Sequence, residues 1–424
     1  MPRYRVSSSF VGVVFSAEVA FSARSWPYVK DVAVPWLLCS GQRVMTRLAS
    51  LGRHRRSLSS YYRFLSDGKW RIEVLFHSLF ALILRTFPTA HVTLAVDDTL
   101  CPKWGRKIFG MGRFYDSSGY PPRGWIWGHN WVVLAVVVEV RQRFSLALPF
   151  WIELYRPRST CRAADFRTRL EITIDALRRV RRWFPGPITV VADGSYGNGT
   201  ILRAVRKLDI TLVARVRCNT SLRTLKPPPK RPGRGRPPSR GVPLGPMSAL
   251  ARRRSAFRRS TVRIYGGQVP TMLREIDAQW EKPKSVGRFV IAIDPRQPKR
   301  KTYLVCTDMA LSGETILETF ARRWSIEQLF SVAKCQMGLD SAEVRTERSV
   351  RRHAALTMAM VTWVEVWAQQ TGIAKTARSF HQKLTQLRYR AVVEAYFGAK
   401  ATPRASPRIA RTLGRLFATA TAVA

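Results

Sequence analysis

The spacing of apolar residues divides the chain into a helical first part and a strand-rich second part. Residues 1–90 have mostly helical spacing, and the clearest helical segments, 42–51 and 57–65, flank Gly52. A helix, a glycine turn and a basic second helix are typical of a helix-turn-helix, and a small helical bundle with solvated arginines fits the same pattern equally well. From Val92 onward the pattern changes to strands.

Strand-like runs then alternate with helices. The β-branched run 131–140 predicts a buried strand, with 145–155 as its antiparallel neighbour, and the Gly-, Pro- and Tyr-rich stretch 103–130 predicts a loop. Further strands are expected at 92–99, 188–193, 210–216 and 302–306, and helices at 163–184, 198–208 and 313–337. Hairpins followed by alternating strands and helices predict an α/β fold of the ribonuclease-H type, a mixed sheet flanked by helices.

A basic, proline-rich segment interrupts this unit. Residues 226–238 cannot bury a core and are expected to be extended. Arg234 and Arg236 within it could enter a DNA minor groove, although a flexible surface loop is the favoured interpretation. Short strands then predict a β-rich insertion, at 261–265, 271–278 and 289–293.

The charge of the chain indicates its partner. Lys and Arg number 72 against 27 Asp and Glu, which gives a net charge of +45. Such a balance favours a polyanion such as DNA, bound with a strong dependence on salt. The apolar fraction of 46% and the 13 tryptophans predict a large core, unlike that of short ribosomal or histone-like proteins.

The cysteines and the apolar runs exclude several classes of protein. The six cysteines form no Cys-x-x-Cys pair, so zinc-finger and thioredoxin-like sites have no support, and their wide spacing fits reduced thiols in a cytoplasm. No run approaches the roughly 18 apolar residues of a membrane span. We therefore expect a cytoplasmic, nucleoid-associated protein without a membrane partner.

Acidic residues end two of the apolar runs that predict strands. Asp97 and Asp98 end the run that begins at Val92, and Asp193 ends another. Strands that bring carboxylates to one sheet edge can hold two divalent cations, which prefer oxygen ligands. Neighbouring residues of a regular strand point to opposite faces, so only one of Asp97 and Asp98 can be a direct ligand. Taken singly, each of these acids is also typical of a turn.

The helix expected at 313–337 carries an unusual polar stripe. Phe320, Arg323, Glu327 and Lys334 follow one another at spacings of three, four and seven, which places them on one helical face. A row of surface ion pairs would explain the alternating signs but not the acids on the strands.

The stripe resembles the Tyr-x-x-Arg-x-x-x-Glu-x-x-x-x-x-x-Lys signature of bacterial insertion-sequence transposases of the DDE class, with Phe320 in place of Tyr. The resemblance extends to Val96–Thr99 with Lys103 and Gly105, to 192–196, and to Gly338–Asp340. It covers roughly residues 92–365. It implies a ribonuclease-H-like core with a β-rich insertion, which fits the 134-residue interval between positions 193 and 327.

The resemblance also implies a site and a reaction. Asp97, favoured over Asp98, would act with Asp193 and Glu327 on two Mg²⁺ ions, for which Mn²⁺ can substitute. Transposon-end phosphates would contact Arg323 and Lys334, with the Phe320 ring beside them. Trp280 is a candidate to stack on a flipped base, although a core tryptophan is the favoured interpretation.

The partners implied are double-stranded transposon ends and target DNA, bound by a homodimer. A nuclease that cuts without rejoining and a domesticated, catalytically silent DNA-binding protein are the alternatives. The expected parts are a helical, DNA-binding region (1–90), two core segments (91–217 and 301–370), the basic segment with the insertion between them (218–300), and a helical, basic tail (371–424).

Overall fold

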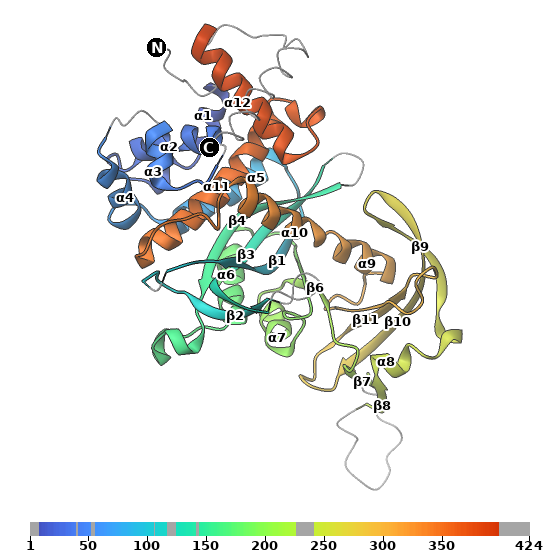
Figure 1. Cartoon of the computed structure of the whole chain (residues 1–424). Coiled ribbons are helices and arrows are strands. Elements are labelled where there is room, and N and C mark those ends of the chain that lie inside the picture. Colours follow the sequence, from blue (N-terminus) through green and yellow to red (C-terminus); the bar gives the residue numbers. More distant parts are fainter. Residues whose placement is uncertain are drawn as a thin grey trace.

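The structure is a computed structural model that describes residues 8–39, 41–51, 56–105, 107–116, 124–140, 144–225 and 241–397. Within these residues one mixed sheet of twelve strands runs through the molecule and is flanked by helices (Figure 1), which confirms the predicted α/β fold of the ribonuclease-H type. No helix in these ranges is long and apolar enough to cross a bilayer.

Five strands form the part of the sheet from which the aspartates emerge. In sheet order these strands are β4 (Phe144–Tyr155), β3 (Gly124–Val140), β1 (Val92–Pro102), β5 (Ile188–Ala192) and β6 (Thr211–Arg215). The second strand in sheet order, β3, is antiparallel to its neighbours β4 and β1. β1, β5 and β6 run parallel to one another. Residues 131–138 of β3 are all buried, as their continuous apolar sequence predicts.

Two helices follow β4 and β5, and side-chain caps fix where they begin. α6 (Arg169–Trp183) starts later than the sequence predicts because Thr168 forms a capping box with Glu171: each side chain accepts from the other residue's backbone N–H, at 3.2 and 2.8 Å. α7 (Gly199–Lys207) begins at the Asn198 cap. The residues expected to open α6 instead form a 3₁₀ turn, η3 (Ala163–Asp165).

The helices predicted in the first 90 residues are present and pack on the C-terminal helices. They are α1 (Ser8–Phe15), α2 (Trp26–Leu38), α3 (Met45–Leu51), α4 (Leu58–Ser66) and α5 (Ile72–Thr86), and the C-terminal pair are α11 (Glu347–Gln370) and α12 (Phe380–Phe397). The buried Arg352 of α11 donates to the carbonyl oxygens of Leu65 and Trp70, at 3.0 and 2.8 Å. Residues 52–55 lie outside the described ranges, so the helix-turn-helix interpretation stays a prediction.

The predicted insertion is β-rich and extends the core sheet. Its strands are β7 (Ser221–Thr224), β8 (Pro243–Pro246), β9 (Arg258–Ile264), β10 (Gly267–Trp280) and β11 (Val286–Ile293). β11 pairs with β12 (Lys301–Cys306), and β12 pairs with β6, so one hydrogen-bonded sheet runs from the core into the insertion. A short helix, α8 (Met247–Leu250), and the 3₁₀ turns η1 (Glu18–Ala20), η2 (Arg158–Thr160), η4 (Arg254–Ala256) and η6 (Ile373–Lys375) complete the described elements.

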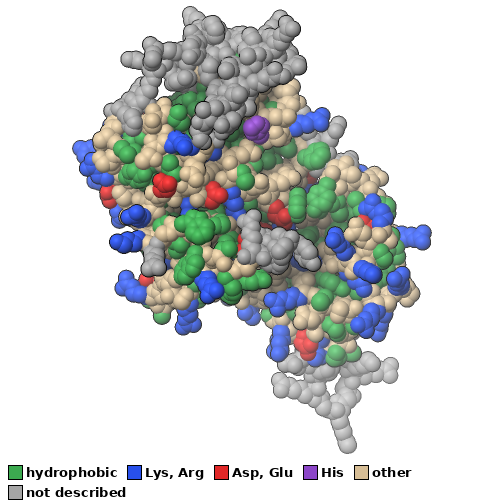
Figure 2. Space-filling view, viewed as in Figure 1, with side chains coloured by type: hydrophobic (Ala, Val, Ile, Leu, Met, Phe, Trp, Pro, Cys, Tyr) green, Lys and Arg blue, Asp and Glu red, His purple; other side chains and the backbone are tan. Residues whose placement is uncertain are grey.

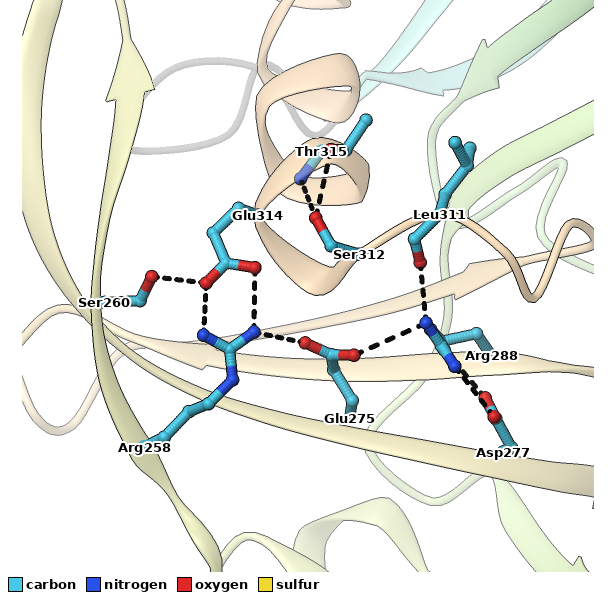
Figure 3. A network of polar contacts seen from close by, with 9 residues as sticks. All are labelled: Arg258, Ser260, Glu275, Asp277, Arg288, Leu311, Ser312, Glu314 and Thr315. Atoms are coloured by element: carbon cyan, nitrogen blue, oxygen red, sulfur yellow. Dashed lines mark hydrogen bonds and ion pairs between the residues drawn. The ribbon is translucent and has the colours of Figure 1, made fainter.

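A polar network joins the insertion to the helix that leads into the signature motif (Figure 3). Glu314, in the first turn of α9 (Gly313–Ala321), accepts from Arg258 of β9, and Arg258 also pairs with Glu275 of β10. Arg288 of β11 binds Asp277 through two contacts of 2.8 Å. Because Arg258 donates to it, the pKa of Glu314 falls to about 2. The insertion is thereby fixed to the start of α9.

Two sequence predictions fail locally. The loop expected at 103–130 contains strand β2 (Gly112–Asp116) and the first residues of β3, which form a hairpin. The helix expected at 313–337 is not continuous: after α9 the chain makes a turn, continues as α10 (Trp324–Ser331) and ends in a π-helical segment, η5 (Val332–Gln336). At the break, the backbone N–H of Arg323 bonds to the oxygen three residues back, at Phe320, which tightens the helix locally.

Candidate active site

Asp97 and Asp193 meet at one edge of the sheet because their strands are parallel. In the register of β1 and β5, Val96 lies opposite Ala192, so the residue that follows each of them is an aspartate on the same edge. Burial, and then the charge of Asp193, raise the pKa of Asp97 to about 7. Asp193 Oδ1 accepts from the backbone N–H and the hydroxyl of Ser195, at 2.9 and 2.6 Å. The pair is thus a site of concentrated negative charge.

Arg323, at the start of α10, connects this edge of the sheet to Glu327 of the same helix. Its Nη1 donates to Asp97 Oδ2 at 2.7 Å, and its Nη2 donates to Glu327 Oε1 at 2.7 Å. The side chains of Arg323 and Asp97 are each only 15% exposed, so this pairing is sheltered from water. One guanidinium therefore joins a carboxylate of the sheet to a carboxylate of α10.

Asp98 points away from this group and has its own partners. Its Oδ2 accepts from Asn130 of β3 at 2.9 Å and from Arg169 of α6 at 2.7 Å. Its Oδ1 accepts from the Tyr196 hydroxyl at 3.3 Å. Because neighbouring strand residues face opposite ways, the position of Asp98 leaves Asp97 facing the other carboxylates.

The sequence interpretation missed Tyr196 and Arg169 as parts of this arrangement. Tyr196 is almost fully buried, and burial together with the three nearby aspartates, Asp98 first, holds the pKa of its phenol well above the usual value. The motif at 192–196 included the tyrosine, which was the available signal, whereas no pattern identified Arg169 in the first turn of α6.

Lys103 is a third missed residue, and it organises the chain after η5. Its buried Nζ donates to the carbonyl oxygens of Asp340 and Ala342, at 2.6 and 2.9 Å. Trp36 Nε1 donates to the carbonyl of Met337, at 3.0 Å, in the same segment. Lys103 and Gly338–Asp340 both belong to the resemblance described above, so their pairing had a signal in the sequence.

The other two residues of the signature lie on either side of α10, Phe320 in α9 and Lys334 in η5. Phe320 is partly buried, and the Arg323 guanidinium lies 5.8 Å from its ring centroid. Lys334, in η5, lies close enough to Cys101 at the end of β1 to lower the pKa of that thiol, although burial dominates and raises it to about 12. This places Phe320 beside Arg323 and Lys334 toward the end of β1.

The remaining candidates are not brought to the carboxylates. Trp280 ends β10, is half-buried and packs edge-to-face on Phe289, with ring centroids 6.2 Å apart. Four strand spacings, roughly 19 Å, separate β10 from β5 in the sheet. Arg234 and Arg236 lie outside the described residues.

The donor atoms of the site are mostly carboxylate oxygens. The carboxylates supply the oxygen ligands that Mg²⁺ prefers, and burial, followed by the nearby charge of Asp193, raises the pKa of Asp97. In the arrangement described, Arg323 occupies the position between Asp97 and Glu327, and the described ranges hold no group of three Asp, Glu, His or Cys already arranged around one ion. The donor chemistry therefore suits Mg²⁺, while in this structure Arg323 pairs with two of the carboxylates.

Comparison with known proteins identifies the family. Residues 20–269, more than half of the chain, match the family described as DDE superfamily endonuclease. The matched range includes Asp97 and Asp193 and ends before Glu327. A comparison with curated proteins gave no match. From the extent of the family match, together with a mixed sheet that brings two aspartates to one edge, the chain belongs to the DDE superfamily of endonucleases.

Proposed function

We propose that the protein is a transposase that binds the ends of an insertion sequence and catalyses metal-dependent DNA strand cleavage and strand transfer. The observation that carries the proposal is the contact of Arg323 with both Asp97 and Glu327, beside Asp193. Asp97 and Asp193 lie within the residues that match the DDE family, and Glu327 lies in the motif that resembles the transposase signature. The arrangement brings these two parts of the chain together.

Asp97, Asp193 and Glu327 would hold two Mg²⁺ ions, or Mn²⁺ in their place. Such ions polarise the scissile phosphate and lower the pKa of the attacking water or hydroxyl. Asp98 is a positioning residue in this proposal, since its oxygens accept from Asn130, Arg169 and Tyr196 and so fix the middle of β1.

Arg323 can bind either the carboxylates of the site or a DNA phosphate. With no DNA bound, it neutralises Asp97 and Glu327. A DNA phosphate offers two oxygens to both Nη atoms at once, so the guanidinium would move to the phosphate and leave the carboxylates to the ions. Lys334 would contact a further phosphate as a point charge. The Phe320 ring would pack against the Arg323 guanidinium. DNA binding and metal binding are therefore coupled.

The test uses a supercoiled plasmid that carries the DNA flanking the coding sequence. We expect the protein to nick or linearise this plasmid with Mg²⁺, and to join the cleaved ends to a second plasmid. Glu327→Gln should abolish both reactions and retain duplex binding, since the basic surface supplies the affinity. Gln328→Glu is the control, because it changes the neighbouring position and keeps Glu327. A glutamate at position 328 cannot replace the one at 327 in this geometry.

Each outcome separates the alternatives. Cleavage without joined products would support a nuclease that does not transpose. Salt-sensitive DNA binding with no metal-dependent cutting would support a silent DNA-binding protein. Normal cleavage by Glu327→Gln would contradict the assignment of the site. Sedimentation of the complex with end DNA tests the expected homodimer in the same preparation.

A further inference from the structure

A group of exposed aromatic side chains lies on the hairpin formed by β2 and the start of β3. Arg113 pairs across the hairpin with Trp127, and Tyr115 pairs with Trp125. The three aromatic side chains are between 55% and 60% exposed. Trp104, at 91%, follows Lys103, whose backbone N–H donates to the Trp127 carbonyl at 3.1 Å. We call Trp104, Arg113, Tyr115, Trp125 and Trp127 the aromatic face.

The strand alternation explains why these side chains share one side. Residues 113, 115, 125 and 127 are exposed, whereas the intervening Phe114 and Ile126 are partly buried. Phe114 packs near Tyr155 of β4, with ring centroids 6.1 Å apart. The hairpin is thus fixed to the core by one side and presents the aromatic face to solvent. In Figure 2, hydrophobic side chains gather over the region of β2, with lysine and arginine side chains around them.

Two of these rings, Tyr115 and Trp125, contact each other, and Trp125 also contacts a cation. The Arg113 guanidinium lies 5.0 Å from the Trp125 ring centroid, and the Tyr115 ring meets the same tryptophan edge-on at 5.6 Å. Large aromatic side chains grouped on a surface are typical of binding sites. Rings interleaved with arginine are the surface on which unpaired nucleic-acid bases stack, because every base has a flat π face and every nucleotide carries a phosphate.

The charge of the chain favours DNA over a second copy of the protein as the occupant. A second copy would bring another net charge of +45 and another Arg113 to the same face, so like charges would oppose the contact. A DNA strand brings the opposite charge. The sign of the charge and the chemistry of the rings therefore agree on the same ligand.

The aromatic face is also connected to the carboxylates by a single strand. β3 runs without interruption from Trp127 to Val133, which is paired with Asp97. Six strand residues span roughly 20 Å, a distance that a few extended nucleotides can cover. A strand that leaves the carboxylate edge could therefore reach the aromatic face.

We propose that the aromatic face binds the unpaired bases of a DNA strand that lies next to the cleavage site. The proposal rests on the proposed function, from which it takes DNA as the substrate. It adds that the protein recognises locally opened or single-stranded DNA beside the reacting phosphate, by stacking and without reading the base sequence.

The experiment compares two DNA probes on a variant of the full chain. The probes are a labelled oligothymidylate of about 20 nucleotides and a blunt duplex of the same length, measured by fluorescence anisotropy in EDTA. Trp125→Ala/Trp127→Ala should lose at least about tenfold in affinity for the single strand and stay within about twofold on the duplex. Trp125→Phe/Trp127→Phe should retain most of the single-strand affinity. Phe144→Ala, an exposed aromatic at the start of β4, is the matched control and should change neither.

The results that overturn the proposal are distinct from those that overturn the proposed function. An unchanged affinity for the single strand, or an equal loss on both probes, would contradict it. A dimer that dissociates in the alanine variant, with single-strand binding unchanged, would assign the aromatic face to self-association instead. Because EDTA prevents metal-dependent cleavage, these outcomes do not depend on whether the protein cuts DNA. Thermal melting of each variant checks that the exposed substitutions leave the fold intact.

Discussion

Arg323 donates to Asp97 across 226 residues of sequence, from the turn between α9 and α10 to the middle of β1. The same guanidinium contacts Glu327, which is only four residues away on the helix. The Arg323 side chain therefore links the carboxylate of Glu327 on the helix to that of Asp97 on the sheet. Without this side chain, Asp97 and Glu327 would lose the cation that they share.

Arg323→Ala should therefore destabilise the fold in the absence of metal. Removing one partner of a largely buried ion pair leaves an uncompensated charge, and we expect a loss on the order of 3 kcal/mol in the free energy of unfolding. Urea unfolding at pH 8 in EDTA measures it. Arg322→Ala is the control, since its pair with Glu139 is exposed and should contribute under about 1 kcal/mol. Equal effects of the two substitutions would argue against the bridging role.

Asp97→Asn should change how stability depends on pH. The folded pKa of Asp97 is about 7, above the ordinary 3.8, so the folded state binds its proton more tightly than the unfolded state. The stability that this proton provides is complete below pH 3.8 and is lost as the pH rises through 7. Relative to the parent, Asp97→Asn should therefore gain stability between pH 5 and pH 8, by on the order of 1–3 kcal/mol. Parallel urea-unfolding curves at both pH values would contradict the raised pKa.

Much of the fold and the meeting of the two aspartates could be predicted from the sequence. Continuous apolar runs ending in Asp97 and Asp193 are local signals, and they become a site as soon as the two strands are parallel neighbours. The hairpin at β2 was missed because its glycines and prolines suggest a loop. Its alternating residues, Arg113 with Tyr115 and Trp125 with Trp127, were the signal of paired strands.

The partners of these acids could not be predicted in the same way. The helical spacing of Arg323 and Glu327 indicates a pair within the helix, but the contact with Asp97 depends on where α10 packs. Arg169 reaches Asp98 because α6 begins at its Thr168 cap and packs against β3 and β4. Contacts of this kind come from tertiary packing, and no periodicity in a single sequence encodes them.

Comparing Asp97→Ala with Asp98→Ala should show that Asp97 binds the metal and that Asp98 only positions the site. An ion that binds only the folded state raises stability by about 1.4 kcal/mol at ten times its Kd. We expect Asp97→Ala to lose this Mg²⁺-dependent gain in melting temperature. Asp98→Ala should keep it, although the variant starts from a lower melting temperature because Arg169 loses its partner. The reverse pattern, with the gain lost only in Asp98→Ala, would make Asp98 the ligand.

Lys103→Met should reduce cleavage without reducing DNA affinity. The substitution leaves the carbonyl oxygens of Asp340 and Ala342 without their donor, which costs about 1–3 kcal/mol for a buried group. The segment after η5 would then be free to shift, and with it the helix that carries Glu327. Since a displacement of about 1 Å at a reacting group can cost on the order of 100-fold in rate, plasmid cleavage should fall at least about tenfold.

The matched control for this variant is Lys107→Met, which removes an exposed lysine four residues away on the same connection. Both variants lose one positive charge, so duplex binding should weaken slightly and equally in the two. A selective loss of cleavage in Lys103→Met, with duplex affinity matched to that of Lys107→Met, would establish Lys103 as a positioning residue. If cleavage instead falls in proportion to DNA affinity in both variants, Lys103 acts only through its charge, and the contact with Asp340 and Ala342 has no part in aligning the site.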